Sequence, residues 1–226
     1  MVCKGDVNVV CLKWGVKYPA DYVNRLHRMV KRSLARPHRF VCLTDDPSDL
    51  DPAIETKPIE NPELSGWWHK LTLFKPKFFD LEGPTLFLDL DLVIIDGLDN
   101  FFLYPGEFCV IRDWRPQEHN SSVFRIVLGT HPEVWEQFAR NHESISGRLH
   151  GDQDWLREML PDALGWPKGW VKSYKWHLQS RDGEGPVPLP VDTFIVAFHG
   201  RPRPHEVKDG SWGPWKQAPW IADYWK

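Results

Sequence analysis

Two aspartates, Asp89 and Asp91, interrupt the otherwise apolar run LFLDLDLVIID over residues 86–96. The apolar residues predict a buried strand, and side chains two positions apart on a strand point to the same side. Two neighbouring carboxylates repel each other unless a proton or a cation lies between them. The spacing therefore predicts a same-facing pair that holds a divalent cation. The alternative is a strand-end pair bonded only to loop amides.

The rest of the chain indicates how this pair is positioned. Strands are expected at residues 7–14, 39–46, 85–95, 107–114, 121–128 and 193–200, and helices at 19–34, 67–75, 131–141 and 152–160. Strands that alternate with helices predict an α/β fold, in which a mostly parallel, Rossmann-like sheet is flanked by helices. Ligands of such sheets bind beyond the carboxyl ends of the strands, which is where we expect Asp89 and Asp91.

Composition limits the classes of protein that fit. The 226 residues, 42% of them hydrophobic, predict a single domain over residues 1–226. A formal net charge of -3 gives no polycationic field, so we expect no nucleic-acid partner. No apolar run approaches the ~20 residues that a membrane helix needs, and no signal-like segment follows Met1. We therefore expect a cytoplasmic protein without a membrane span.

Two residue types are notable for their number or spacing. The four cysteines are far apart and form no CxxC pair, so we expect neither disulfides nor a zinc site. Thirteen tryptophans are present, seven of them at positions 166, 170, 176, 212, 215, 220 and 225. These indoles either anchor a loop-rich tail to the core or form a wall on which sugars stack.

The acidic pair matches the motif of two enzyme families. The segment Asp89-Leu90-Asp91-Leu92-Val93 resembles the DxDx[TV] motif of haloacid-dehalogenase-type phosphatases, in which one Asp is the nucleophile and the next the acid/base. That motif normally lies on the first core strand, whereas two predicted strands precede it here. A phosphatase also needs a later Ser/Thr, a Lys and a second acidic pair, and only residues 151–154 offer the last of these.

The order of motifs along the chain resembles that of GT-A nucleotide-sugar-dependent glycosyltransferases, in particular their glycogenin-like and galactosyltransferase-like members. The matching segments, in order, are VVCLKWG, VCLTDD, HKLTLF, LFLDLDLVIID, HNSSVFRI, GDQDWL and FHGRPRPH. The resemblance implies a GT-A fold with a nucleotide-binding half (1–100) and a donor-sugar and acceptor half with the Trp-rich tail (101–226). It also implies transfer from a nucleotide-diphosphate sugar, with UDP favoured, to a glycan, protein or small-molecule acceptor.

The resemblance also implies a metal site. Asp91 is the expected direct ligand of Mn²⁺ or Mg²⁺, Asp89 shares the metal and the ribose, and His199 is the expected third ligand. An imidazole ligand shifts the preference from Mg²⁺ toward Mn²⁺. The cation would neutralise the charge that develops on the leaving diphosphate.

Contacts to the nucleotide and its phosphates follow from the same resemblance. Arg201 and Arg203 come soon after His199, and Arg203 stands where the relatives often carry a Lys before Pro, which exchanges a point charge for a forked donor. Other expected contacts to the base, ribose, phosphates or donor sugar are Lys13, Trp14, Tyr18, Thr44, Asp45 and Lys70. A solvated helix lysine is the alternative for Lys70, and an ordinary turn is the alternative for Asp45 and its neighbours.

For the donor sugar, the resemblance implies Asn120, Ser121, Asp152 and Gln153, because amides and carboxylates bind vicinal hydroxyls. The relatives often have Asn-x-Gly where this chain has a serine at position 122. If the anomeric centre is inverted, Asp152 or Asp154 is the expected general base, whereas retention requires no such base. Asp152 acting as the N-cap of a helix is the alternative. A carbohydrate-binding protein without turnover also stays open.

Overall fold

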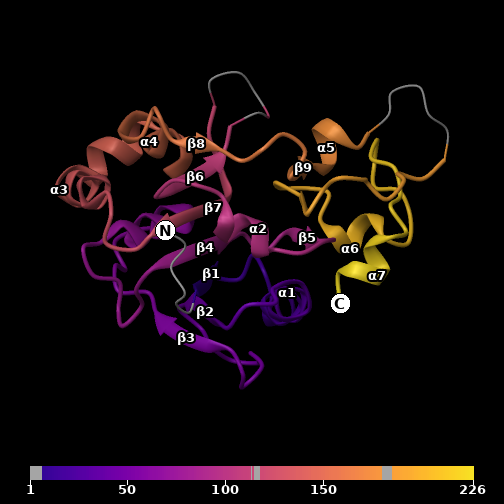
Figure 1. The fold of residues 1–226 in the computed structure, drawn as a ribbon, viewed down its shortest axis with the longest axis horizontal. Helices are drawn as coiled ribbons and strands as arrows, with labels where there is room; N and C mark the ends of the chain where they lie inside the picture. Colours follow the sequence, from indigo (N-terminus) through magenta and orange to yellow (C-terminus); the bar gives the residue numbers. More distant parts are fainter. Residues whose placement is uncertain (1–6, 113, 115–117, 180–184) are drawn as a thin grey trace.

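The computed structural model describes residues 7–112, 114, 118–179 and 185–226. Its centre is a seven-stranded sheet with the strand order β3-β2-β1-β4-β7-β6-β8 (Figure 1). The strands are β1 (Val7–Lys13), β2 (His38–Thr44), β3 (Glu55–Pro58), β4 (Pro84–Leu88), β6 (Phe108–Ile111), β7 (Asn120–Val127) and β8 (Leu164–Gly165). All neighbouring pairs are parallel except β4 with β7 and β6 with β7. The expectation of a mostly parallel α/β sheet is confirmed.

A second, three-stranded sheet contains β5 (Leu92–Ile94), β10 (Ile195–Ala197) and β9 (Val171–Ser173), in that order. The single strand expected at residues 85–95 is therefore wrong, because the chain leaves one sheet after Leu88 and enters the other at Leu92. The backbone N–H of Asp89 donates to Ser122 O at 2.9 Å, whereas Asp91 O accepts from the N–H of Phe198 at 2.9 Å. The two aspartates thus belong to a turn that joins the sheets.

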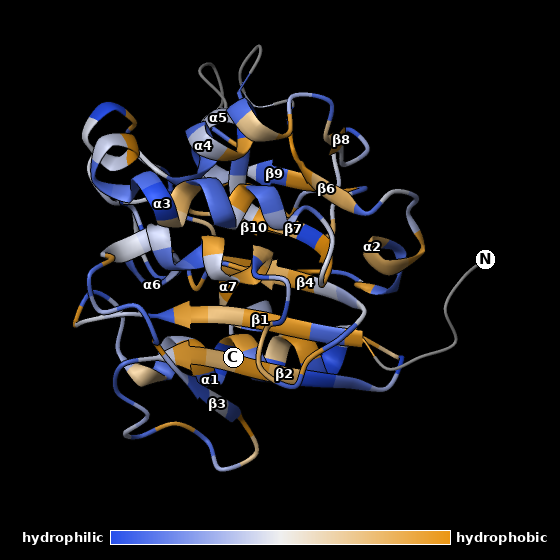
Figure 2. Cartoon of the chain, turned by 90° about the vertical axis from the view of Figure 1, so that its left-hand side faces the viewer, coloured by the Kyte–Doolittle hydropathy of each residue, from blue (hydrophilic) through white to orange (hydrophobic). Residues whose placement is uncertain are grey.

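Both faces of the larger sheet are covered, which explains why its strands are continuous apolar runs. On one face, Val9 packs with α1 (Ala20–Ser33) and with the smaller sheet. On the other face, Val10 packs with η1 (Gly66–Phe74), α3 (Pro132–Arg148) and α4 (Asp152–Met159). Figure 2 shows the central strands as the most hydrophobic part of the ribbon. The shorter helices are α2 (Asp99–Leu103), α5 (Tyr174–His177), α6 (Pro204–Val207) and α7 (Ile221–Tyr224).

Two helices differ from expectation. The segment expected to be helical over residues 67–75 is a 3₁₀ helix; it ends at Phe74, and Lys75 is extended (ψ 144°), as a residue before proline prefers. The helix expected at 131–141 continues to Arg148, and Asn141 marks a kink with non-helical φ and ψ of -134° and 23°. A polar Asn at the kink therefore reads as a helix end in the sequence although the helix resumes.

A buried arginine on β7 holds the chain that follows α2. Arg125 is 2% exposed and donates to the carbonyl oxygens of Phe101 at 2.7 Å, Tyr104 at 2.6 Å and Gly106 at 2.5 Å. These carbonyls belong to the last turn of α2 and to the loop after it, where backbone donors run out, and the guanidinium supplies donors to them.

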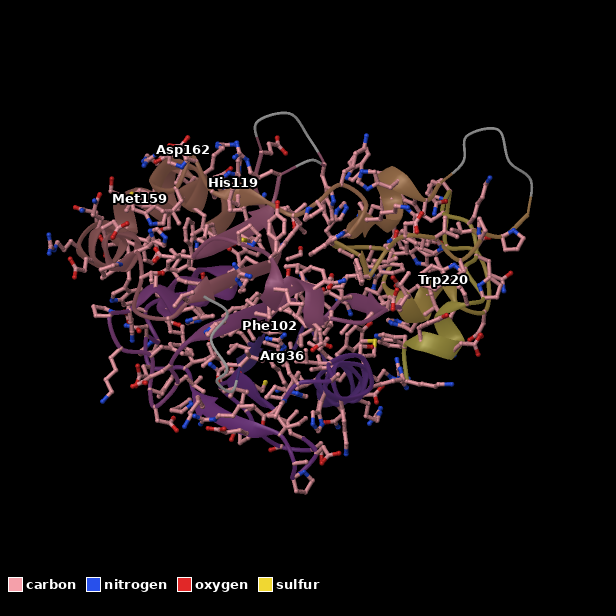
Figure 3. The ribbon with its side chains drawn as sticks, viewed as in Figure 1. Arg36, Phe102, His119, Met159, Asp162 and Trp220 are labelled. Atoms are coloured by element: carbon pink, nitrogen blue, oxygen red, sulfur yellow. The ribbon has the colours of Figure 1, made fainter. Side chains whose placement is uncertain are left out.

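Most of the late tryptophans anchor the tail, as one of the two interpretations predicted. Trp166, Trp220 and Trp225 are buried in the core that contains α1, and the indole N–H of Trp220 donates to Val187 O at 3.1 Å (Figure 3). Trp176 differs, because it is 54% exposed. Of the cysteines, those at positions 11, 42 and 109 are buried and free, and Cys3 lies outside the described residues. In the described part of the chain, no helix has the length and apolar character needed to cross a membrane.

Candidate functional site

A cavity of about 430 Å³ opens where β1 and β4 end. Because β7 runs antiparallel to β4, and β10 runs antiparallel to β5, the start of β7 and the end of β10 reach the same place. Segments around η1 and the start of α4 complete the wall. Ten residues expected at the site line this cavity: Trp14, Tyr18, Lys70, Asp89, Asp91, Asn120, Ser121, Asp152, Gln153 and His199.

The acidic turn lies at the floor of the cavity. Asp91 is 6% exposed, and its Oδ2 accepts a hydrogen bond of 2.7 Å from the hydroxyl of Tyr18. Burial raises the pKa of Asp91 to about 6, and the negative charge of Asp89 contributes to the same rise. The ionised pair is therefore disfavoured in the protein alone, which is the situation that a bound cation relieves.

Lys70 connects this turn to the start of β7. Its Nζ lies 2.7 Å from Asp89 Oδ1 and donates to the carbonyl and hydroxyl oxygens of Ser121 at 3.3 and 3.4 Å. Burial lowers the pKa of Lys70, but the charges of Asp89 and Asp152 outweigh it, so the pKa is raised above its ordinary value. The side chain is buried, so the alternative of a solvated helix lysine is wrong.

Asp152 is the first residue of α4, and Gly151 takes the N-cap position, so the expectation that Asp152 caps this helix is wrong. Asp152 is 3% exposed, and burial raises the pKa of its carboxyl while the charge of Lys70 lowers it. Its Oδ2 has no hydrogen-bond partner among the described residues. A buried carboxylate oxygen without a donor is costly, and its place in the wall of a cavity points to a ligand that donates to it.

His199 follows β10 and borders the cavity. Its Nε2 lies 2.6 Å from Ser173 Oγ, and its ring packs near Trp114 and almost parallel to Trp176, at an interplanar angle of 12°. Lys175 Nζ donates to His199 O at 2.7 Å. Within the described ranges, no three His, Cys, Asp or Glu side chains lie close enough together to hold a metal ion. The two aspartates are brought together, but the complete set of three ligands is not.

Three expected nucleotide contacts lie at the ends of β1 and β2 without lining the cavity. Lys13 Nζ donates to Asp46 O at 2.9 Å, and Thr44 Oγ1 donates to the same oxygen at 2.9 Å. The Asp45 carboxylate accepts from the N–H of Gly15 at 2.9 Å. These bonds tie the turn after β1, which carries Trp14 and Tyr18, to the turn after β2. They are consistent with the turn interpretation of Asp45 and its neighbours.

Asp154 is the second expected base, and it does not line the cavity. Its Oδ2 accepts from the N–H of His150 at 3.2 Å, and its Oδ1 lies 3.4 Å from Arg157. These contacts hold the first turn of α4, where negative charge is favourable.

The two arginines after His199 have different surroundings. Arg201 Nε lies 3.4 Å from Glu206 Oε1 and is largely exposed. The guanidinium of Arg203 lies over the ring of Tyr18, 4.7 Å from its centroid. Arg203 is therefore adjacent to the cavity through Tyr18, whereas Arg201 lies further out on the surface.

The sequence alone did not identify Lys17, Trp67 and His150, which also line the cavity. Trp67 and Trp68 are adjacent aromatic residues, and only Trp68 is buried. Because successive side chains on a helical turn point in different directions, one of the two had to face away from the core. Lys17 and His150 are exposed loop residues with no sequence signal of their own.

Comparison with known proteins identifies the architecture. No family model and no curated protein sequence matches the chain. The galactosyltransferase LgtC, solved with donor and acceptor sugar analogues, matches with a TM-score of 0.62 and 15% identity over 87% of this chain and 88% of LgtC. An active-site variant of LgtC matches with a TM-score of 0.68 and 14% identity over 96% and 94%. The glycosyltransferase GlyE of Streptococcus pneumoniae TIGR4 matches with a TM-score of 0.66 and 14% identity over 96% of this chain and 59% of GlyE. The chain therefore has the fold of GT-A glycosyltransferases.

Proposed function

We propose that the protein is a metal-dependent glycosyltransferase that moves a sugar from a nucleotide diphosphate, UDP first among the candidates, to an acceptor. The observation that carries this proposal is the cavity in which the Asp89–Asp91 turn, Lys70 and Asp152 meet, with Asp152 Oδ2 lacking a hydrogen-bond partner among the described residues. A donor of this kind carries phosphate charges at one end and hydroxyl groups at the other. The cavity offers a complementary group to each.

The two carboxylates fit a hard divalent cation. Both are oxygen donors in one turn, and the negative charge of Asp89 adds to the burial that raises the pKa of Asp91. In this proposal Asp89 and Asp91 hold Mn²⁺ or Mg²⁺, with Mn²⁺ preferred, and His199, which lines the same cavity without being grouped with them in this structure, would be the third ligand. The ion would supply Lewis-acid neutralisation of the leaving diphosphate.

Cationic and aromatic groups of this chain are proposed to hold the nucleotide. Trp14 and Tyr18 would flank the base, as the side chains that line the cavity beside β1. Arg203 and Lys17 supply positive charge near Tyr18, at 4.7 and 5.0 Å from its ring centroid. The turns held by the side chains at 13, 44 and 45 keep this wall in place, and Arg201 would contact only the outer phosphate region.

The donor sugar is proposed to lie against the start of β7 and α4. Asp152 Oδ2 can accept a hydrogen bond from a sugar hydroxyl, with Asn120, Ser121 and Gln153 beside it in the lining. Of the two candidate bases, Asp152 is favoured, because it borders the cavity and its pKa is raised. Asp154 is already engaged by backbone and arginine contacts.

A sugar acceptor is favoured over a protein or another small molecule. The matching LgtC structure contains both a donor and an acceptor sugar analogue, and its chain is matched over 88% of its length. The haloacid-dehalogenase interpretation loses its support, because the fold is of the GT-A type and the acidic turn follows β4 instead of the first strand of the domain. A sugar-binding protein without turnover is the remaining alternative, and measuring UDP release distinguishes it from a transferase.

Thermal unfolding with nucleotides tests the proposal. A ligand that binds only the folded state at 100 times its Kd adds about 2.7 kcal/mol, which corresponds to roughly 5–10 °C in Tm for a chain of this size. UDP with Mn²⁺ should give such a shift, EDTA should abolish it, and Asp91→Asn should prevent it. Asp162→Asn, at an exposed position outside the cavity, is the matched control and should behave as the parent.

Activity is read as release of UDP from UDP-glucose or UDP-galactose in the presence of Mn²⁺. Binding of UDP without any release of UDP from either UDP-sugar would favour a binding protein over a transferase. Unchanged melting curves with both UDP and GDP would remove the transferase proposal. An Asp91→Asn variant that still binds UDP in a Mn²⁺-dependent manner would remove the metal site.

A further inference from the structure

Two adjacent tryptophans at the start of η1 have opposite environments. Trp68 is 7% exposed and stacks on Phe138 of α3, with ring centroids 5.1 Å apart and an interplanar angle of 16°. Trp67 is 49% exposed and lines the cavity. The buried neighbour anchors the segment, so the position of Trp67 is set by the core and not by its own burial. A large apolar side chain held half-exposed in a cavity wall is typical of a binding surface.

Gly151, which precedes α4, leaves room for this indole because it has no side chain. A Cβ at Gly151 would lie 2.8 Å from Nε1 and 3.1 Å from Cδ1 of Trp67, closer than atoms of a folded protein approach. A larger residue at this position would have to displace the indole, whereas the backbone itself is permissive, since a φ of -178° is open to any residue. The pyrrole half of the indole lies against the backbone that begins α4, while half of the side-chain surface stays open. Gly151 thus fixes the orientation of Trp67.

Trp67 lies next to the proposed donor-sugar site, where the acceptor hydroxyl must approach, and it contacts Gly151 in the cavity wall. Gly151, which it touches, directly precedes Asp152, the proposed ligand of the donor sugar. The other exposed indole of the cavity, Trp14, extends from the end of β1 and lies 6.2 Å from the ring of His69. Trp14 and Tyr18 already provide aromatic surface for a base. Trp67 has no proposed role in binding the base, and it lies beside the site where the transferred sugar would lie.

We propose that Trp67 is a platform for the pyranose ring of the acceptor, so that the acceptor is a hexopyranoside. This inference rests on the transferase function proposed above. The flat indole matches the apolar C–H face of a pyranose, while the hydroxyl edge of the sugar faces the polar groups at the start of α4. An extended peptide backbone offers no such face.

Transfer of the sugar from the nucleotide donor to this acceptor needs no further reactant. A bond forms between an acceptor hydroxyl oxygen and the anomeric carbon of the donor, and the bond from that carbon to the diphosphate oxygen breaks. The hydroxyl proton passes to a carboxylate or to the departing diphosphate.

The test uses methyl glycosides of glucose, galactose, mannose and N-acetylglucosamine as acceptors. UDP release from UDP-glucose and UDP-galactose is measured with Mn²⁺, with and without each glycoside. Trp67→Ala should raise the acceptor KM at least tenfold while the UDP-sugar KM changes less than twofold, and Trp67→Phe should recover most of the loss. Gly151→Ala should raise the acceptor KM in the same direction, because the added Cβ displaces the indole.

The matched control is Trp135→Ala, which removes a partly exposed indole on α3 that does not line the cavity. Its acceptor KM should stay within twofold of the parent. A Trp67→Ala variant that raises the UDP-sugar KM instead would assign this indole to the donor and overturn the proposal. An unchanged acceptor KM, or a parent that binds UDP but is stimulated by none of the methyl glycosides, would also overturn it. A parent that neither binds nor cleaves a UDP-sugar would remove the transferase function itself.

Discussion

Replacing Lys70 with methionine should destabilise the protein by about 3–5 kcal/mol at pH 8, the usual cost of removing one partner from a buried charge pair. Lys70 is the cation between two carboxylates with unequal access to water. Asp89 is 26% exposed at its side chain and can be hydrated when the lysine is lost. Asp152 is only 3% exposed and cannot be hydrated in the same way. Most of the cost of losing Lys70 therefore arises from the uncompensated charge of Asp152.

The cost should depend on pH with a definite sign. Burial raises the pKa of Asp152 and Lys70 lowers it, so the pKa of this carboxyl rises further when Lys70 is removed. For an acid whose pKa is higher in the folded than in the unfolded protein, stability falls as the pH rises from the unfolded value of 3.8 through the folded one. The destabilisation by Lys70→Met should therefore be largest at pH 8 and smaller near pH 5.

The assay is urea unfolding followed by tryptophan fluorescence at both pH values, in EDTA. The control is Lys75→Met, which removes a more exposed lysine 2.9 Å from Glu60 and should cost less than about 1 kcal/mol. Adding Asp152→Asn to Lys70→Met should recover roughly 2 kcal/mol at pH 8, because the neutral amide needs no cation. A loss below about 1 kcal/mol at pH 8, or an equal loss at pH 5 and pH 8, would refute this account of the buried charges.

Three further substitutions test other parts of the structure. Asp91→Asn should raise the free energy of unfolding by up to about 3 kcal/mol at pH 8 in EDTA, because a carboxyl with a pKa of about 6 is disfavoured in its ionised form; no gain is expected near pH 4. A loss of stability at pH 8 would contradict this expectation. Tyr18→Phe should cost about 1 kcal/mol in urea unfolding, because it removes the hydroxyl that donates to Asp91, and an unchanged midpoint would count against that bond. Arg125→Met should cost at least about 3 kcal/mol, because it leaves the buried carbonyl of Phe101 and two partly buried carbonyls without this donor, and Arg157→Met, at a surface arginine, should cost under about 1 kcal/mol. Equal losses in the two arginine variants would argue against the buried network.

Much of the fold could be predicted from the sequence. The strands β1 and β2 are continuous apolar runs, and α1 is long with a strongly periodic apolar face. The break between β4 and β5 could not be predicted, since a continuous apolar run is equally compatible with one strand or with two strands of different sheets. β3 (Glu55–Pro58) was missed because it is a polar edge strand that ends in proline. Such a strand is defined by its hydrogen bonds to a neighbour and not by burial.

The candidate site was predictable where a charged or polar residue interrupts an apolar element. Asp91 and Lys70 are of this kind, and both are buried at the cavity. Trp67 was not predictable, because an apolar residue in an apolar segment carries no sign of which way it faces. The roles of Lys13 and Asp45 also depend on distances between separate loops, which no local pattern records.

The turn that joins the two sheets also has a consequence for the order in which the protein is completed on the ribosome. All seven strands of the larger sheet have been synthesised once residue 165 has been added. The pairing of Ile94 with Ile195 joins residues about 100 positions apart, and the N–H of Phe198 that bonds Asp91 comes later still. Pairings of such long range form late. A nascent chain can therefore build its main sheet while Asp91 remains hydrated, and it encloses this carboxylate only after residue 198 has been added.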